Sequence, residues 1–197
     1  EWDVIVVGAG PAGCFAAAQI AHAGFKVLII EEHQEIGRPV QCAGLISPRA
    51  LDLAGVNRSI VLNNLTGLHV FSPLDAELRV KSDSDLALAV DRSAFDRELA
   101  VKAEQAGAVL LKGVKADGIE RIPGGFHLTA SRISIENIGM DTKLLIGADG
   151  VDSNVAKWLQ LSCNSPKAVM YAADAELQSA DTDSMSVFLG RDIAPGW

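Results

Sequence analysis

Cysteine is scarce in this chain, and its spacing excludes two common kinds of protein. Three cysteines occur among 197 residues, at Cys14, Cys42 and Cys163. Their number is odd and no Cys-x-x-Cys pair is present, so neither a disulfide framework nor a zinc site is expected. We interpret them as reduced thiols, which indicates a cytoplasmic protein.

Basic residues are too few for a protein that binds nucleic acid. The formal net charge is −8 at pH 7, whereas a nucleic-acid surface needs a basic patch or stripe. No apolar run approaches the ~18 residues of a membrane-spanning helix, and no secretory signal precedes the first strand. Peripheral contact with the inner face of a membrane stays open, because an apolar patch can make it without basic residues.

Signatures of nucleophilic and metal-dependent catalysis are also missing. The four histidines are scattered along the chain, and neither a Gly-x-Ser-x-Gly motif nor a Cys/His pairing occurs. No metal site is therefore expected. A hydrophobic content of 49% with 21% charged residues is typical of a folded globular protein that can bury a core.

The most informative stretch runs from Asp3 to Gly13. Four β-branched residues, Val4 to Val7, precede a Gly-x-Gly-x-x-Gly pattern made by Gly8, Gly10 and Gly13, and an alanine-rich run follows. This order predicts a buried parallel strand, a tight turn and a helix whose amino end can face a pyrophosphate.

A second strand, predicted over 26–30, strengthens this interpretation. It ends at Glu31, which lies 18 residues after Gly13, about where an acid that binds a ribose is expected. A glycine-rich turn in a fold without a nucleotide is the alternative. The context favours dinucleotide binding.

The rest of the chain alternates between helical and extended patterns. We expect a loop over 33–45, helices over 47–56, 91–106 and 151–159, and strands elsewhere. Arg38 in that loop is a candidate contact for an anion, with a solvated loop arginine as the alternative. Arg92, in the first turn of a helix, is a second candidate, with a protein carboxylate as the alternative partner. The expected strands are 65–71, 77–81, 86–90, 109–111, 114–122, 125–132, 133–138, 143–146, 168–177 and 184–189.

A second junction of strand, glycine and helix follows at Gly147-Ala148-Asp149-Gly150. An aspartate between small residues at the end of a strand can accept hydrogen bonds from the hydroxyls of a ligand. The alternative is an Asx-turn or a helix cap.

Together, these motifs and Val90 to Leu99 resemble the FAD-dependent hydroxylase/reductase superfamily. Within it, Glu35 to Gly44 is most similar to the geranylgeranyl reductases (digeranylgeranylglycerophospholipid reductase-like), which saturate isoprenoid chains, and 194–197 resembles the opening of their substrate-side motif. The resemblance implies an α/β fold: a Rossmann-like FAD-binding domain of the glutathione-reductase/hydroxylase type with an inserted antiparallel β substrate domain, truncated at the C-terminus. It divides the chain into an FAD-binding domain, 1–62 and 90–163, and part of a substrate domain, 63–89 and 164–197.

The resemblance also implies roles for single residues. The pyrophosphate would contact the first turn, and Glu31 would contact the adenosine ribose. The backbone of Val114 would contact the adenine, and Asp149 would contact the ribityl chain. The isoalloxazine would lie along the loop from Arg38 to Gly44, with Cys42 as the candidate catalytic residue. The cofactor-binding residues implied are Gly8, Gly10, Pro11, Ala12, Gly13, Glu31, Glu32, Arg38, Cys42, Ala43, Gly44, Arg92, Val114, Asp149 and Gly150.

The implied reaction is hydride transfer from reduced FAD to the C=C bonds of geranylgeranyl chains in archaeal-type ether lipids. An isoprenoid lipid is then the substrate, and an external donor (ferredoxin, a deazaflavin or NAD(P)H) supplies the electrons. Three alternatives share these motifs: an aromatic hydroxylase, a flavin-linked dehydrogenase that feeds a quinone, and a nucleotide-binding module without turnover.

Overall fold

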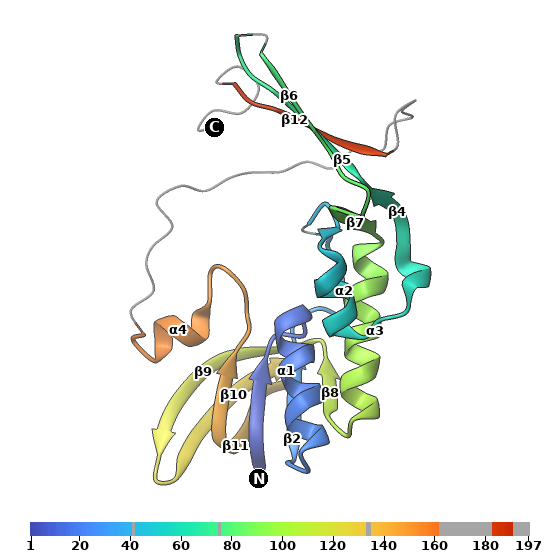
Figure 1. The fold of residues 1–197 in the computed structure, drawn as a ribbon. Coiled ribbons are helices and arrows are strands. Elements are labelled where there is room, and N and C mark those ends of the chain that lie inside the picture. Colours follow the sequence, from blue (N-terminus) through green and yellow to red (C-terminus); the bar gives the residue numbers. More distant parts are fainter. Residues whose placement is uncertain (41, 75, 133–134, 162–182, 191–197) are drawn as a thin grey trace. The chain divides into compact units, whose positions relative to one another are not determined.

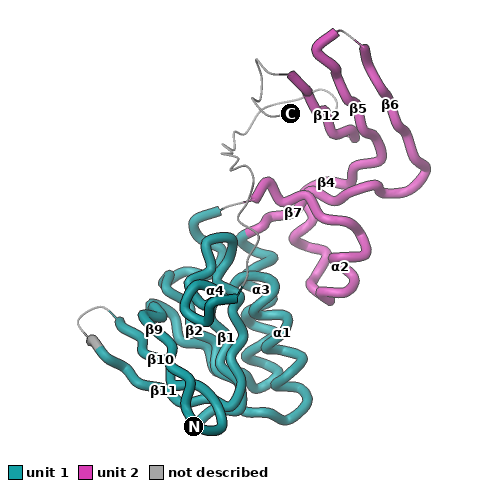
Figure 2. Tube along the Cα trace, turned by 90° about the vertical axis from the view of Figure 1, so that its left-hand side faces the viewer, with its two compact units in different colours: residues 1–40, 93–170 teal, residues 41–92, 171–197 magenta. Residues whose placement is uncertain are grey.

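The structure is a computed structural model that describes residues 1–40, 42–74, 76–132, 135–161 and 183–190. The chain divides into two compact units. The first comprises residues 1–40 and 93–170, and the second comprises residues 41–92 and 171–197. Figure 2 colours the two units separately. These units are defined by compactness and not by function. The boundaries of the functional domains inferred from the sequence therefore stay a prediction.

The first unit is organised around a six-stranded sheet. Its strand order is β8-β2-β1-β11-β10-β9, in which β8, β2, β1 and β11 are parallel and β11, β10 and β9 are antiparallel. The helices α1 and α3 lie along one face of the parallel strands (Figure 1). The elements are β1 (Trp2–Val7), α1 (Pro11–His22), β2 (Val27–Glu31), α3 (Arg92–Gln105), β8 (Val109–Lys112), β9 (Val114–Ile122), β10 (Gly125–Arg132), β11 (Ile135–Gly147) and α4 (Asn154–Trp158).

Both central strands are apolar on both faces, as the run of β-branched residues predicted. Ile5 and Leu28 point to one face, where they pack with Leu128 of β10 and Val155 of α4. Side chains of the other parity, such as Val6, are equally buried. The small side chains of α1 allow that helix to pack closely on β1 and β2, so the α/β prediction is confirmed.

The carboxyl-terminal strand of this sheet differs from the prediction. The sequence suggested separate strands over 133–138 and 143–146, but β11 is one strand of 13 residues. Its first part pairs with β10 and its last part pairs with β1. Between the two predicted segments, Asp141 faces solvent and Thr142 is buried, and both lie in one continuous strand. The expected break was therefore wrong.

The second unit contains two small sheets, β3-β7-β4 and β12-β5-β6. The predicted hairpin is confirmed, since β5 and β6 pair antiparallel, and β12 pairs parallel with β5. The elements are β3 (Leu45–Ile46), α2 (Pro48–Ala54), the 3-10 helix Arg58–Ile60, β4 (Val61–Leu65), β5 (Gly67–Phe71), β6 (Glu77–Lys81), β7 (Ala87–Val90) and β12 (Ser184–Phe188).

Local signals place α2 correctly. Ser47 caps the helix by accepting a hydrogen bond from the Ala50 N–H at 3.1 Å, Pro48 is its first residue, and Gly55 closes it in the left-handed conformation. The sequence did not predict β3, which has only two residues, or β4, which contains two asparagines. The predicted strand 168–177 and the 194–197 motif lie outside the described residues.

No helix in the described part of the chain combines the length and the hydrophobicity needed to cross a bilayer.

We predict that Leu128→Ala lowers the free energy of unfolding by about 2–5 kcal/mol, because it leaves a cavity in the core of the first unit. Leu128 is fully buried, whereas Leu144 on the neighbouring strand is 52% exposed. Leu144→Ala is thus the matched control, with an expected loss below about 1 kcal/mol. Chemical denaturation measures both, and equal losses would contradict the assignment of the core.

Candidate functional site

The close packing of the turn between β1 and α1 requires glycine at its first and last motif positions. Gly8 has φ +102°, and a Cβ there would collide with the backbone carbonyl of Ala148. A Cβ on Gly13 would collide with the Gly8 carbonyl. The strand β1, the helix α1 and the turn at Ala148 therefore approach each other more closely than a side chain at Gly8 or Gly13 would permit.

The middle glycine has no such structural reason. Gly10 is the N-cap of α1 with φ −69° and ψ 177°, a conformation open to any residue. A Cβ on Gly10 would meet no atom within 4 Å. α1 also has no side-chain cap and no acidic residue in its first turn, so its amino end presents uncapped N–H groups and the positive end of the helix dipole. An anion beside Gly10 fits this open space.

One backbone hydrogen bond joins the second junction to β1, and another joins the first junction to β2. The Ala148 N–H donates to the Val7 carbonyl at 2.8 Å, and the Gly8 N–H donates to the Ile30 carbonyl at 2.8 Å. The carboxyl ends of β2, β1 and β11 thus meet at one edge of the sheet, where open α/β folds bind ligands.

Asp149 serves as a cap in this structure. Its carboxylate accepts hydrogen bonds from the Ser153 hydroxyl (2.6 Å) and from the backbone N–H groups of Asn154 (2.7 Å) and Val155 (3.1 Å). These bonds fix the start of α4, so the capping alternative is realised. A ligand contact from Asp149 stays a prediction.

Glu31 lies directly beside the first turn. Its Oε2 accepts a hydrogen bond from the Ala9 N–H at 2.8 Å, and its Oε1 accepts one from the His33 N–H at 2.9 Å. His33 Nδ1 also lies 2.7 Å from Oε1. Nothing in the sequence pattern pointed to this histidine, because a residue two positions after a strand end carries no periodic signal.

The remaining predicted residues of the first unit differ in burial and surroundings. The side chain of Val114 is 3% exposed within the core, so only its backbone is available to a ligand. Glu32 lines an open depression of about 340 Å³ together with His33, Gly113, Lys115, Ser131 and Arg132. Arg38 is exposed. The site residues that lie in this unit are Gly8, Gly10, Pro11, Ala12, Gly13, Glu31, Glu32, Arg38, Val114, Asp149 and Gly150.

Four predicted residues, Cys42, Ala43, Gly44 and Arg92, belong to the second unit. Gly44 has a structural reason of its own, since its φ is +75° and a Cβ would collide with the Val90 carbonyl. Its carbonyl accepts a hydrogen bond from the Val90 N–H at 2.9 Å. Cys42 is exposed. The catalytic role of Cys42 and the ligand contacts of all four residues stay predictions.

Cys14 is unsuited to chemistry at this site. It is fully buried in α1, and its thiol donates to the Ala9 carbonyl at 3.2 Å. Burial raises the pKa of the Cys14 thiol to about 12, with smaller effects from nearby carboxylates. No cluster of metal-ligating side chains occurs among the residues with described positions.

Comparison with known proteins identifies this arrangement. A family model described as an FAD binding domain matches residues 1–194. The chain belongs to this family. The prediction of FAD as the cofactor is therefore confirmed, and the open space at Gly10 beside an uncapped helix terminus fits the diphosphate of FAD.

Relatives of this FAD-binding domain support the predicted resemblance to the geranylgeranyl reductases. The chain is 34% identical over 201 residues to a digeranylgeranylglycerophospholipid reductase from Methanocaldococcus jannaschii, covering 99% of this chain and 51% of that protein. A reductase of the same name from Methanothrix thermoacetophila is 32% identical, with 98% and 51% covered. The chain thus spans about half the length of the curated relatives it matches.

A solved structure shares the fold. The geranylgeranyl bacteriochlorophyll reductase-like protein from Thermoplasma acidophilum superposes with a TM-score of 0.78 at 28% identity, covering 96% of this chain and 50% of that one. The predicted fold class is therefore confirmed.

Two glycine substitutions should separate folding from cofactor binding. Gly13→Ala is expected to cost at least about 2 kcal/mol of unfolding free energy, because backbone must move. Gly10→Ser should leave stability unchanged or slightly raised, because serine is a good N-cap, while weakening FAD binding at least about tenfold by filling the anion space. Calorimetry and flavin fluorescence measure the two effects. Native FAD affinity in Gly10→Ser would contradict the placement of the diphosphate.

The two described cysteines should differ in reactivity. Because only the thiolate is alkylated, iodoacetamide at mildly alkaline pH is expected to modify Cys42 and to spare Cys14 in the folded protein. Peptide mass spectrometry reads the modification, and denatured protein provides the control in which both react. Equal labelling in the folded state would show that Cys14 is not buried as described.

Proposed function

We propose that this chain forms the flavin-binding part of an FAD-dependent oxidoreductase that saturates geranylgeranyl chains of archaeal-type ether lipids. The names of the relatives support this activity, and the similarity extends over almost the whole chain. The observation that carries the lipid part of the proposal is an aliphatic face on the sheet β12-β5-β6.

That face follows from strand register. Leu68 pairs with Val80 and Val70 pairs with Leu78 between β5 and β6, and opposed residues in a sheet point to the same side. The strand β12 adds two further apolar side chains, since Met185 pairs with Leu68 and Val187 with Val70. The aliphatic face is thus defined as Leu68, Val70, Leu78, Val80, Met185 and Val187.

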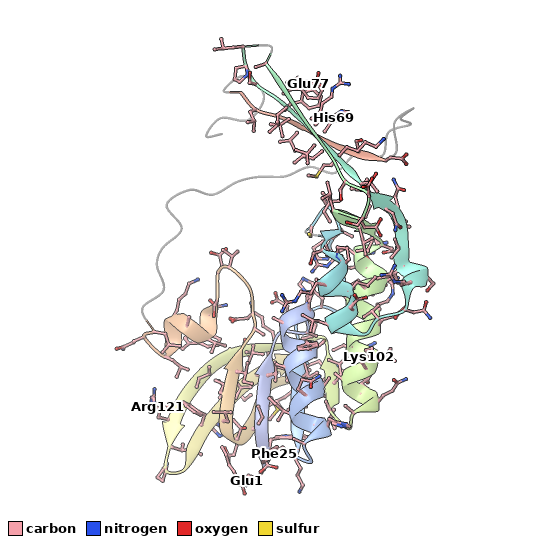
Figure 3. All side chains as sticks on the ribbon, in the orientation of Figure 1. Glu1, Phe25, His69, Glu77, Lys102 and Arg121 are labelled. Carbon is pink, nitrogen blue, oxygen red and sulfur yellow. The ribbon has the colours of Figure 1, made fainter. Side chains whose placement is uncertain are left out.

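The other side of this sheet has a different character. It carries His69 and Glu77 (Figure 3), the stacked rings of Phe71 and Phe188, and the ion pair of Arg79 with Glu77. On the aliphatic face, by contrast, Leu78 is 60% exposed and Val80 is 39% exposed. An isoprenoid chain has only apolar surface to offer, so binding it there removes apolar area from water on both partners.

Residues of this chain would bind and orient the cofactor. The amino end of α1 would receive the diphosphate, Glu31 would hold the adenosine ribose, and Asp149 with Gly150 would hold the ribityl chain. Arg92 would contact the phosphate or the ribityl region, and the loop from Arg38 to Gly44 would hold the isoalloxazine. Reduced FAD supplies a hydride when bound.

An isolated alkene has no carbonyl to polarise, so acceleration depends on proximity and on a proton donor. Cys42 is our candidate for a catalytic residue at that site. The functional division into 1–62 with 90–163 and 63–89 with 164–197 belongs to this proposal. So do a cytoplasmic location, a peripheral approach to the membrane that holds the lipid, and an external reductant such as ferredoxin, a deazaflavin or NAD(P)H.

The test uses the intact protein, purified with its flavin and reduced chemically. Mixed with a digeranylgeranyl lipid, it is expected to show a flavin spectrum that reoxidises as the mass of the lipid increases by added hydrogen. Leu78→Asp should raise the apparent KM for the lipid about tenfold or more, because a charge replaces apolar contact, while chemical reduction of the flavin is unchanged.

Leu74→Asp is the matched control, since Leu74 is 90% exposed in the turn between β5 and β6 and off the aliphatic face. A colourless protein that FAD does not reconstitute would refute the flavoprotein proposal. A native KM in Leu78→Asp would refute the aliphatic face as the lipid site.

A further inference from the structure

The carboxylate of Glu31 is held from two directions. The Ala9 N–H binds Oε2, while the backbone N–H and the imidazole of His33 both bind Oε1. The Glu31 side chain is 14% exposed and that of His33 is 45% exposed. A carboxylate has about four lone-pair positions, so three donors leave little freedom of orientation.

The backbone fixes where His33 stands. Its N–H is bound to Glu31, and its carbonyl accepts a hydrogen bond from the Gly113 N–H at 3.1 Å, at the corner between β8 and β9. Gly113 has φ +67°, and a Cβ there would collide with the side chain of Gln34. The corner therefore packs against the loop at His33, and the backbone hydrogen bonds of His33 place its imidazole beside Glu31.

The charges around the imidazole are balanced. Glu31 lies on one side, and Glu32, Lys115 and Arg132 line the same depression as His33. Because an ionised carboxylate only accepts hydrogen bonds, Nδ1 carries a hydrogen in this contact whether the ring is neutral or charged. The contact can therefore orient Glu31 in both protonation states of His33.

We propose that His33 is a positioning residue for binding of the adenosine ribose. Its Nδ1–H fixes the Glu31 carboxylate so that the lone pair that remains on Oε2 faces a ribose hydroxyl, and the Ala9 N–H ties the same carboxylate to the diphosphate turn. This inference rests on the ribose role proposed for Glu31. Ordering the acceptor in advance lowers the cost of binding the hydroxyls.

The test compares ADP with 2′,3′-dideoxy-ADP as ligands of the intact apoprotein, using calorimetry. His33→Ala is expected to weaken ADP about tenfold, as loss of one hydrogen bond to a charged group does, and to leave dideoxy-ADP within about twofold. His33→Asn should restore ADP binding, because the amide nitrogen of asparagine can take the place of Nδ1. In a Glu31→Gln background, His33→Ala should have no further effect.

A matched control exists in the same unit. His127 pairs through Nδ1 with Asp141, and Thr142, beside Asp141, pairs with Trp2 at the opposite end of β1 from Gly8. His127→Ala should leave both affinities unchanged.

Each other result has a distinct meaning. Equal weakening of both ligands in His33→Ala, or failure of His33→Asn to restore ADP binding, would make the role of His33 merely structural and overturn the inference. Native ADP affinity in His33→Ala would also overturn it. If the native protein binds ADP and dideoxy-ADP equally, the ribose role of Glu31 fails and the inference falls with it. FAD binding measured in parallel shows whether the flavoprotein proposal survives.

Discussion

The structure of the first unit depends on the close contact of two glycine-containing turns, one after β1 and one after β11. Gly8 and Gly13 let the turn after β1 touch its own helix and the Ala148 carbonyl, and two short backbone hydrogen bonds join the ends of β2, β1 and β11. Close backbone approach of this kind is available only to glycine. It brings the amino end of α1 and the acid at the end of β2 to the same edge of the sheet.

This packing explains why the site needs few charged residues. The helix terminus supplies N–H donors and a partial positive charge for a diphosphate. Glu31 is joined to the same turn through a hydrogen bond from the Ala9 N–H, so the proposed acceptor for a ribose is held next to the proposed donors for a diphosphate. Net charge has little influence on such a site, which agrees with a chain whose formal charge is −8 at pH 7.

Local patterns predicted the fold well where one rule decides the outcome. The β-branched run, the glycine spacing and the Ser47-Pro48 start of α2 each have a single physical reading, and the structure follows them. The sequence failed where tertiary pairing decides: β11 stays one strand because β10 and then β1 pair with it in succession, although its polar middle resembles a loop.

The site could be predicted only in part. Packing explains Gly8 and Gly13, whereas no protein atom lies close to a Cβ on Gly10. The motif alone does not reveal this difference. Asp149 caps α4, a role that spacing left open. His33 carries no signal in the sequence, because a residue two positions after the end of a strand has no periodic pattern. Its carbonyl accepts a hydrogen bond from Gly113, which lies far along the chain.

The central claim is that the diphosphate of FAD rests against the amino end of α1, in the open space at Gly10. A crystal structure of the intact protein with FAD bound tests it most directly. The account predicts diphosphate oxygens at about 3 Å from the backbone N–H groups of Ala12 and Gly13. A diphosphate bound elsewhere, with that helix end facing water or protein side chains, would contradict it.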